Sequence, residues 1–195
     1  TVEMSPTALV KPLLINPQEI ARIADFIILM AYDYHYSGSF TSGPVAPIGG
    51  VPNYREFDII TSINEAKKII PPEKLILGIP LYGYEWETIG NLPGAPAIPG
   101  GASTASNRRV EELIKTCAKC QISFDDITQS PRLVYPDDSN TFFHQIYFEN
   151  ELSFKKKLEL AQSSQIAGVA LWALGYEGEK ILKPLVVYKN SALSF

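Results

Sequence analysis

Three short clusters of aromatic and acidic residues are the parts of this sequence whose residue types could do chemistry. They are Tyr32-Asp33-Tyr34-His35-Tyr36, Tyr82-Gly83-Tyr84-Glu85-Trp86, and Trp172 followed by Gly175-Tyr176-Glu177. Aromatic rings stack on the apolar faces of pyranose rings, while carboxylates and hydroxyls form hydrogen bonds with sugar oxygens. A single aromatic residue is more often part of a core, but three such clusters together favour a carbohydrate site.

Each cluster lies at the end of an apolar run that predicts a buried strand. The runs cover residues 25–32, 74–82 and 166–174, and residues 2–5 form a weaker fourth candidate. Their lack of polar alternation is typical of strands that are covered on both faces, as in a parallel sheet. Functional groups of such folds gather after the C-terminal ends of the strands, which is where these clusters lie.

Helices are predicted between the strands. The first begins at Asn16, which can cap it, with Pro17 in the first turn and Glu19 placed to complement the helix dipole. Three more are predicted from about residue 53 to the Pro71-Pro72 pair, from about 107 to 120 and from about 150 to 164. The helix near residue 53 is expected to turn one apolar side inward, made of Phe57, Ile60, Ile63 and Ile70.

The alternation of strands and helices predicts an α/β fold with a parallel sheet. Residues 132–148 add a predicted hairpin around the turn at 136–140, inside an insertion that precedes the last strand. Two architectures fit this order: a doubly wound open sheet and part of a (β/α)8 barrel. A complete barrel typically takes about 250 residues and eight strands, whereas only four main strands are predicted here.

Composition excludes several kinds of partner. The chain has 195 residues and a formal net charge of −4, with a sequence pI of about 5.3. An acidic surface without a long Lys/Arg run argues against binding to nucleic acid or to an anionic membrane. The longest apolar runs, at 26–31 and 75–81, are far too short to cross a bilayer. We therefore expect a single domain that binds neither nucleic acid nor membrane.

The two cysteines and two histidines give little sign of a cofactor or metal. Cys117 and Cys120 have Cys-x-x-Cys spacing, but Cys117 continues a buried helical stripe and no second Cys/His pair completes a zinc site. We expect both to be core or boundary residues. His144 falls in the predicted hairpin and is not expected to be catalytic, whereas His35 follows Asp33 closely enough to contact a substrate.

Three motifs resemble glycoside hydrolase family 18. Met30-Ala31-Tyr32-Asp33 resembles the Met-x-Tyr-Asp motif on the sixth strand of that family, and residues 77–83 (LGIPLYG) resemble its seventh strand. Residues 168–174 (GVALWAL) resemble the eighth, with the family's conserved tryptophan at Trp172. The order and spacing agree over nearly the whole chain. Residues 36–39, 43–47 and 82–86 look like bacterial spore-cortex and cell-wall members, although chitinases more often have Arg where Tyr84 stands.

The resemblance implies the C-terminal half, strands five to eight, of a (β/α)8 TIM barrel with a small α+β insertion before the last strand. Residues 1–86 and 150–195 would form the barrel part, and about 87–149 the insertion. The family's acidic motif, Asp-x-x-Asp-x-Asp-x-Glu on the fourth strand, occurs nowhere in the chain. We therefore expect that the N-terminal half has been cut away with the general-acid Glu, and that this fragment alone is inactive.

The resemblance also assigns roles to residues. These enzymes use substrate-assisted retaining hydrolysis, in which Tyr32 would hold the acetamido oxygen and Asp33 would accept hydrogen bonds from the sugar. Trp172 would form the floor of the subsite that holds the distorted sugar. Further substrate-binding candidates are Tyr82, Trp86, His35 and Tyr34. No cofactor or metal is implied.

The expected substrates are β-1,4-linked N-acetylglucosamine polymers, either peptidoglycan or chitin. The alternative is a non-catalytic, chitinase-like carbohydrate-binding protein, which would keep Tyr32 and Trp172. The resemblance implies an extracellular, cell-wall or spore location. A half-barrel with open strand edges is also expected to self-associate or to pair with its missing N-terminal half.

Overall fold

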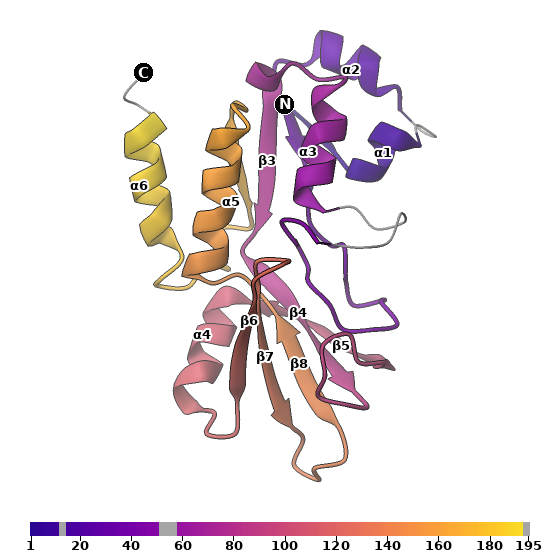
Figure 1. The fold of residues 1–195 in the computed structure, drawn as a ribbon, viewed down its shortest axis with the longest axis vertical. Coiled ribbons are helices and arrows are strands. Elements are labelled where there is room, and N and C mark those ends of the chain that lie inside the picture. Colours follow the sequence, from indigo (N-terminus) through magenta and orange to yellow (C-terminus); the bar gives the residue numbers. More distant parts are fainter. Residues whose placement is uncertain (12–14, 51–57, 193–195) are drawn as a thin grey trace.

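The computed structural model describes residues 1–11, 15–50 and 58–192, and these form two sheets. The first has four parallel strands in the order β1–β2–β3–β9, formed by Val2–Met4, Ile27–Leu29, Leu75–Pro80 and Gly168–Trp172. The second lies beyond the C-terminal ends of these strands (Figure 1). The α/β class and the parallel sheet predicted from the sequence are confirmed, and the described strands do not close into a barrel.

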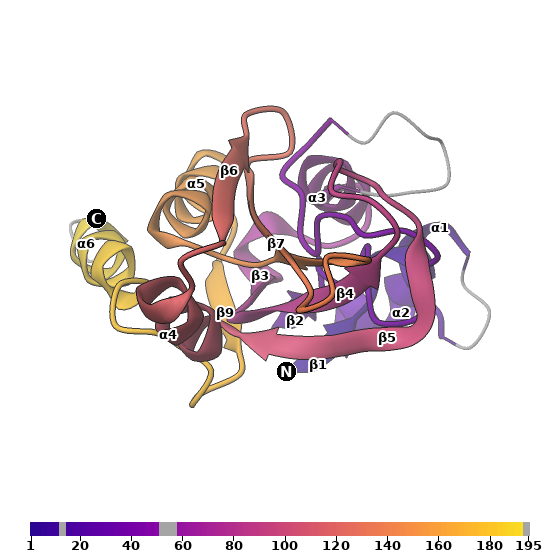
Figure 2. The same cartoon turned by 90° about the horizontal axis from the view of Figure 1, so that it is seen from below.

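Helices cover one side of the parallel sheet. They are α1 (Pro6–Val10), α2 (Pro17–Ile23), α3 (Ile59–Lys67), α5 (Glu151–Ser163) and α6 (Leu182–Ala192), with a 3-10 turn at Pro72–Lys74. Figure 2 shows the helices arranged in an arc around the strands, with α3 against β2 and β3, and α5 against β3 and β9. None of the described helices is long and apolar enough to cross a membrane.

Alternation along β3 separates the two faces of the sheet. Leu75, Leu77 and Ile79 are fully buried in the core shared with the helices. Side chains at the intervening positions, such as Gly78, point the other way, because successive residues of a strand face opposite sides. Register partners face the same side, so Gly78 shares its face with Ala170 on β9. This second face carries no helix among the described residues, and we call it the open face.

The second sheet is antiparallel, in the order β5–β4–β8–β7–β6. Its strands are Ala97–Ser106, Tyr82–Thr88, Phe143–Tyr147, Ser130–Pro136 and Gln121–Asp125. Helix α4 (Asn107–Thr116) packs on it through Val110, which joins a small core with Leu133 and Ile146. The predicted hairpin is confirmed as β7 and β8. Strand β4 follows β3 after one residue. It runs past residue 86, where the barrel part was predicted to end and the insertion to begin, so that division into two parts stays a prediction.

Local polar signals located the helix starts well. The Asn16 side chain accepts hydrogen bonds from the Gln18 and Glu19 amides, as the sequence predicts. Helix α3 is capped instead by Asp58, and the predicted start near Asn53, with Phe57, lies outside the described residues. The expected inward position of Ile60 is wrong, because its side chain is 42% exposed. The turn set by Asp58 directs Ile59 and Ile63 into the core instead.

The two cysteines form a disulfide, with their Cα atoms 5.4 Å apart. The prediction of a helix to Cys120 is wrong, because α4 ends at Thr116 and the chain then turns back. That turn brings the two sulfur atoms together, which helical geometry would not. Cys120 packs against the small core of the second sheet. The prediction of a boundary position is therefore correct for Cys120, but it missed the covalent bond.

A buried ion pair lies where the chain returns from the second sheet to α5. The Lys157 ammonium is fully buried and lies 2.9 Å from the Glu149 carboxylate. The Ser153 hydroxyl also donates to this carboxylate, at 2.6 Å. Burial raises the pKa of Glu149, while Lys157 and Ser153 oppose that rise. Removing one partner would leave the other charge buried and uncompensated.

We predict that Lys157→Met lowers the free energy of unfolding by about 3–5 kcal/mol, because it leaves Glu149 buried without its cation. Urea denaturation followed by circular dichroism measures this change. The matched control is Lys155→Met on the same helix, where the native lysine is exposed and lies 3.7 Å from Glu159. It should cost less than about 1 kcal/mol. Equal midpoints for the two variants would contradict the role of the buried pair.

Candidate functional site

Asp33 is the centre of the candidate site. It follows β2 and has φ of 60°, in the left-handed region that non-glycine residues rarely adopt. Its Oδ1 atom accepts hydrogen bonds from the Tyr82 hydroxyl at 2.6 Å and from the Tyr84 hydroxyl at 3.2 Å. Strained residues persist where the surrounding structure fixes them, and they concentrate at functional sites. The two phenols therefore hold a carboxylate in a costly backbone conformation.

Tyr82 connects the aromatic residues around Asp33. Its ring centroid lies 6.3 Å from that of Tyr32, 5.6 Å from that of Tyr84 and 6.3 Å from that of Tyr176, each in an edge-to-face arrangement. Burial raises the pKa of Tyr82, and its hydrogen bond to the Asp33 carboxylate raises it further. Burial, followed by the Asp33 charge, raises the pKa of Tyr84 to about 12. Both phenols therefore stay protonated donors at neutral pH.

Tyr32 lies over the open face of the parallel sheet. A Cβ atom added at Gly78 would lie 3.1 Å from Cε1 of Tyr32 and 2.9 Å from the Leu29 carbonyl oxygen, so glycine makes room for the ring. Burial, assisted by the charges of Glu3 and Asp33, raises the pKa of Tyr32 to about 12. Its hydroxyl is therefore a hydrogen-bond donor that does not ionise at neutral pH.

Trp172 belongs to the same face as Tyr32. It ends β9 two residues after Ala170, whose register partner is Gly78, and its own partner is Pro80. The Trp172 carbonyl accepts a hydrogen bond from the Leu81 amide at 2.6 Å, and the peptide bond that follows Trp172 is cis. The side chain is 52% exposed. The C-terminal ends of β2 and β9, on either side of β3, thus carry Tyr32, Asp33 and Trp172.

The other three predicted residues are engaged elsewhere. The Tyr34 hydroxyl lies 2.6 Å from the Ser62 hydroxyl of α3, and the Tyr34 ring packs against the main core. His35 donates through Nδ1 to the Pro44 carbonyl at 3.0 Å, which fixes the loop that carries it. Trp86 is fully buried in the second sheet, and its indole N–H donates to a loop carbonyl. In the described parts of the chain none of the three side chains contacts the Asp33 carboxylate, although the Trp86 ring packs against that of Tyr84, with centroids 5.8 Å apart.

Two residues of the arrangement, Tyr84 and Tyr176, belong to the aromatic clusters noted in the sequence but were not assigned a role there. Tyr84 stands two positions after Tyr82 on β4, and residues at that spacing share a face of a strand. A strand assignment for residues 82–88 would have found it. Tyr176 lies in the loop after β9, and its contact with Tyr82 depends on how that loop folds back.

A second polar cluster lies inside the second sheet. Buried Glu85 accepts hydrogen bonds from Arg109 and from the Tyr135 hydroxyl, and Nδ1 of His144 lies 3.1 Å from its carboxylate. The Tyr135 and His144 rings stack with centroids 4.8 Å apart. Glu85 alternates with Tyr84 on β4 and therefore faces away from Asp33. Its carboxylate is compensated on all sides, so the cluster joins α4 to the sheet.

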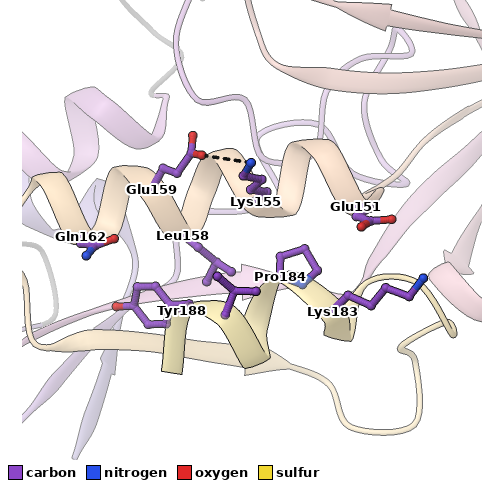
Figure 3. A pocket seen from close by; sticks show the side chains of 9 residues that line it. Glu151, Lys155, Leu158, Glu159, Gln162, Lys183, Pro184 and Tyr188 are labelled. Carbon is purple, nitrogen blue, oxygen red and sulfur yellow. Dashed lines mark ion pairs between the residues drawn. The ribbon is translucent and has the colours of Figure 1, made fainter. Parts of the chain in front are cut away.

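The remaining candidates are weaker. A hollow of about 440 Å³ lies between α5 and α6 (Figure 3), where Leu158 and Pro184 mix with Lys183 and a surface pair of Lys155 and Glu159. It belongs to the outer helices and not to the strand ends that carry Asp33. No cluster of three or more His, Cys, Asp or Glu suited to a metal ion occurs in the described parts of the chain.

Comparisons with known proteins show the family of the chain. The sequence model described as "Glycosyl hydrolases family 18" matches residues 7–177. The chain is 30% identical over 155 residues to the "Putative sporulation-specific glycosylase YdhD" of Bacillus subtilis (strain 168), covering 80% of the chain and 33% of that protein. It is 31% identical over 160 residues to the "Cortical fragment-lytic enzyme" of Bacillus anthracis, covering 79% and 32%. It thus spans about a third of the length of these relatives.

A solved structure agrees with this relationship. The GH18 chitinase of Cycas revoluta, in complex with (GlcNAc)3, superimposes with a TM-score of 0.80 at 25% identity, over 97% of this chain and 54% of the other. The family model, the spore-associated relatives and the chitinase fold agree with the three motifs at the strand ends. The chain therefore belongs to glycosyl hydrolase family 18.

Proposed function

We propose that the protein acts on β-1,4-linked N-acetylglucosamine polymers, in peptidoglycan or chitin, by substrate-assisted retaining hydrolysis. The observation that carries this proposal is the arrangement of Asp33 under two phenol donors, beside Tyr32 and half-exposed Trp172. A flat aromatic surface next to fixed hydrogen-bonding groups matches the alternating apolar and polar faces of a pyranose. The activities named for the relatives, sporulation-specific glycosylase and cortical fragment-lytic enzyme, point to the same class of substrate.

In the proposed reaction, the acetamido oxygen of the substrate attacks the anomeric carbon while a general acid protonates the leaving glycosidic oxygen. Water then opens the cyclic intermediate and retains the anomeric configuration. Tyr32 donates to the acetamido group and holds it in the attacking position, a role suited to a phenol whose pKa of about 12 keeps it protonated. Asp33 accepts from the sugar, and Trp172 supports the ring that is attacked.

The general acid is proposed to come from a part of the barrel beyond these 195 residues. The acidic motif of the family, Asp-x-x-Asp-x-Asp-x-Glu, does not occur in the chain. We propose that the open parallel sheet represents strands five to eight of a (β/α)8 barrel, and that the other strands supply the acid. The chain alone would then bind sugar without cleaving it.

A non-catalytic, chitinase-like carbohydrate-binding protein is the second candidate, because it would keep Tyr32 and Trp172 as well. Both candidates use Trp172, so affinity alone does not separate them. The residue that closes the fourth-strand motif in the longer protein separates them. Glu at that position supports hydrolysis, whereas Gln, Leu or Asn supports binding only.

Trp172→Ala tests the sugar site on the chain itself. We predict that it weakens binding of an N-acetylglucosamine trimer by about 1–3 kcal/mol, because the stacking surface is lost in the ground state. Isothermal titration calorimetry measures this difference. Tyr188→Ala is the matched aromatic control, since Tyr188 lies on α6 in the hollow beside α5, away from the strand ends that carry Asp33, and it should leave the affinity unchanged. Equal affinities of the parent and Trp172→Ala would make Trp172 a structural residue only.

Tyr32→Phe tests the mechanism in the longer protein that carries the acid. We predict that kcat falls much more than the affinity for the oligomer, because the hydroxyl contact matters chiefly as the reaction proceeds. Steady-state kinetics on a fluorogenic N-acetylglucosamine oligomer give both quantities. Equal turnover by the variant and the parent would refute the role of Tyr32.

The two edges of the parallel sheet predict association. Among the described residues β1 pairs only with β2 and β9 only with β3, so each has a free edge that can pair with another strand. We predict that the 195-residue chain self-associates in light scattering and does not hydrolyse the oligomer until an N-terminal half is added. A stable monomer that cleaves the oligomer alone would contradict both the open edges and the external acid.

A further inference from the structure

The loop after β9, residues 173–181, exposes apolar side chains next to the candidate site. Trp172 is 52% exposed, Leu174 is 86% exposed and Tyr176 is 40% exposed, all within five residues. Exposed apolar side chains that gather at one place mark binding surfaces more often than single ones do. The loop is therefore a candidate binding surface as well as the connection to α6.

Tyr176 is folded back onto the aromatic cluster. Its ring meets that of Tyr82 edge to face, with an interplanar angle of 78°. A turn places it there: the Tyr176 amide donates to the Ala173 carbonyl at 3.1 Å, and Gly175, with φ of 93°, adopts a conformation that suits glycine. One edge of the Tyr176 ring is thus supported by protein while two-fifths of the residue stays open to solvent.

Helix α4 of the second sheet holds this loop. The Arg108 amide donates to the Tyr176 carbonyl at 3.1 Å. The Glu111 carboxylate accepts from the backbone amides of Glu179 at 2.9 Å and of Lys180 at 3.3 Å. A Cβ atom at Gly178 would lie 2.1 Å from the Glu111 carboxylate, so a larger residue there would require that carboxylate to move from its place.

We propose that Tyr176 is an additional sugar-binding residue and that Glu111 is the positioning residue that holds it at the site; this inference rests on the proposed function. Tyr82 is too deeply buried to offer a ring face, so Tyr176 extends the accessible aromatic surface that Trp172 begins. The ligand is a pyranose of an N-acetylglucosamine oligomer that packs its apolar face on the exposed part of the ring. The second sheet thereby takes part in sugar binding through α4.

Calorimetry of the 195-residue chain with N-acetylglucosamine trimer and tetramer tests the ring. Tyr176→Ala should weaken binding by about three- to tenfold. Tyr176→Phe should keep most of the affinity, because the ring and not the hydroxyl makes the contact. If Trp172→Ala weakens binding while Tyr176→Ala does not, the role of Tyr176 is overturned and the proposed function stands. If the parent chain binds neither oligomer, both are overturned.

The positioning role has its own variants. Glu111→Ala should reproduce most of the Tyr176→Ala loss. Glu111→Gln should lose less than Glu111→Ala, because its single amide oxygen can still accept from the Glu179 amide, although its NH2 group cannot accept from the Lys180 amide. Glu112→Ala is the matched control and should bind like the parent. Glu112 follows Glu111 on α4, and both line a hollow of about 320 Å³ beside the loop after β9. Adding Glu111→Ala to Tyr176→Ala should cause little further loss, since both act through one ring. Additive losses, or a lower melting temperature with unchanged affinity, would overturn the coupling.

Discussion

The candidate site depends on the hydrogen bond from the Tyr82 hydroxyl to the Asp33 carboxylate. Asp33 belongs to the loop after a strand of the parallel sheet, whereas Tyr82 begins the first strand of the antiparallel sheet. The bond therefore fixes the two sheets relative to each other at the point where the candidate chemistry lies. Burial raises the pKa of Tyr82, so the phenol remains the donor and the carboxylate the acceptor. The left-handed backbone of Asp33 is held by this contact and by that of Tyr84.

The antiparallel sheet is part of the scaffold of the site, and not merely an attachment to it. Its strand β4 supplies Tyr82 and Tyr84, and its helix α4 holds the loop that carries Tyr176. The Glu85 cluster ties α4 to the same strand. Where the chain leaves this sheet, the Glu149–Lys157 pair anchors the start of α5. Polar contacts thus lie at both points where the chain passes between the antiparallel sheet and the rest of the fold.

Much of the fold was predictable because its signals are local. Apolar runs gave the strands β2, β3 and β9, and Asn16 and Asn150 gave helix starts because their side chains cap the adjacent turn. The Cys117–Cys120 disulfide was missed, since the helix was expected to continue to Cys120, whereas it ends at Thr116. Trp86 and Tyr34 were assigned to the site from their neighbours in sequence. Trp86 shares a face of β4 with Tyr82 and Tyr84, but it lies farther along the strand and packs against the Tyr84 ring. The Tyr34 hydroxyl instead pairs with Ser62 of α3.

The sequence by itself determined the family and predicted three residues of the candidate site, Tyr32, Asp33 and Trp172. Those motifs combine residue type with position at a strand end, and both are properties of a short segment. Only the tertiary structure decided which aromatic residues join them. Tyr84 and Tyr176 reach Tyr82 because one sheet continues into another and because α4 draws back a distant loop. Such contacts depend on the relative placement of elements far apart in the chain, which no local pattern specifies.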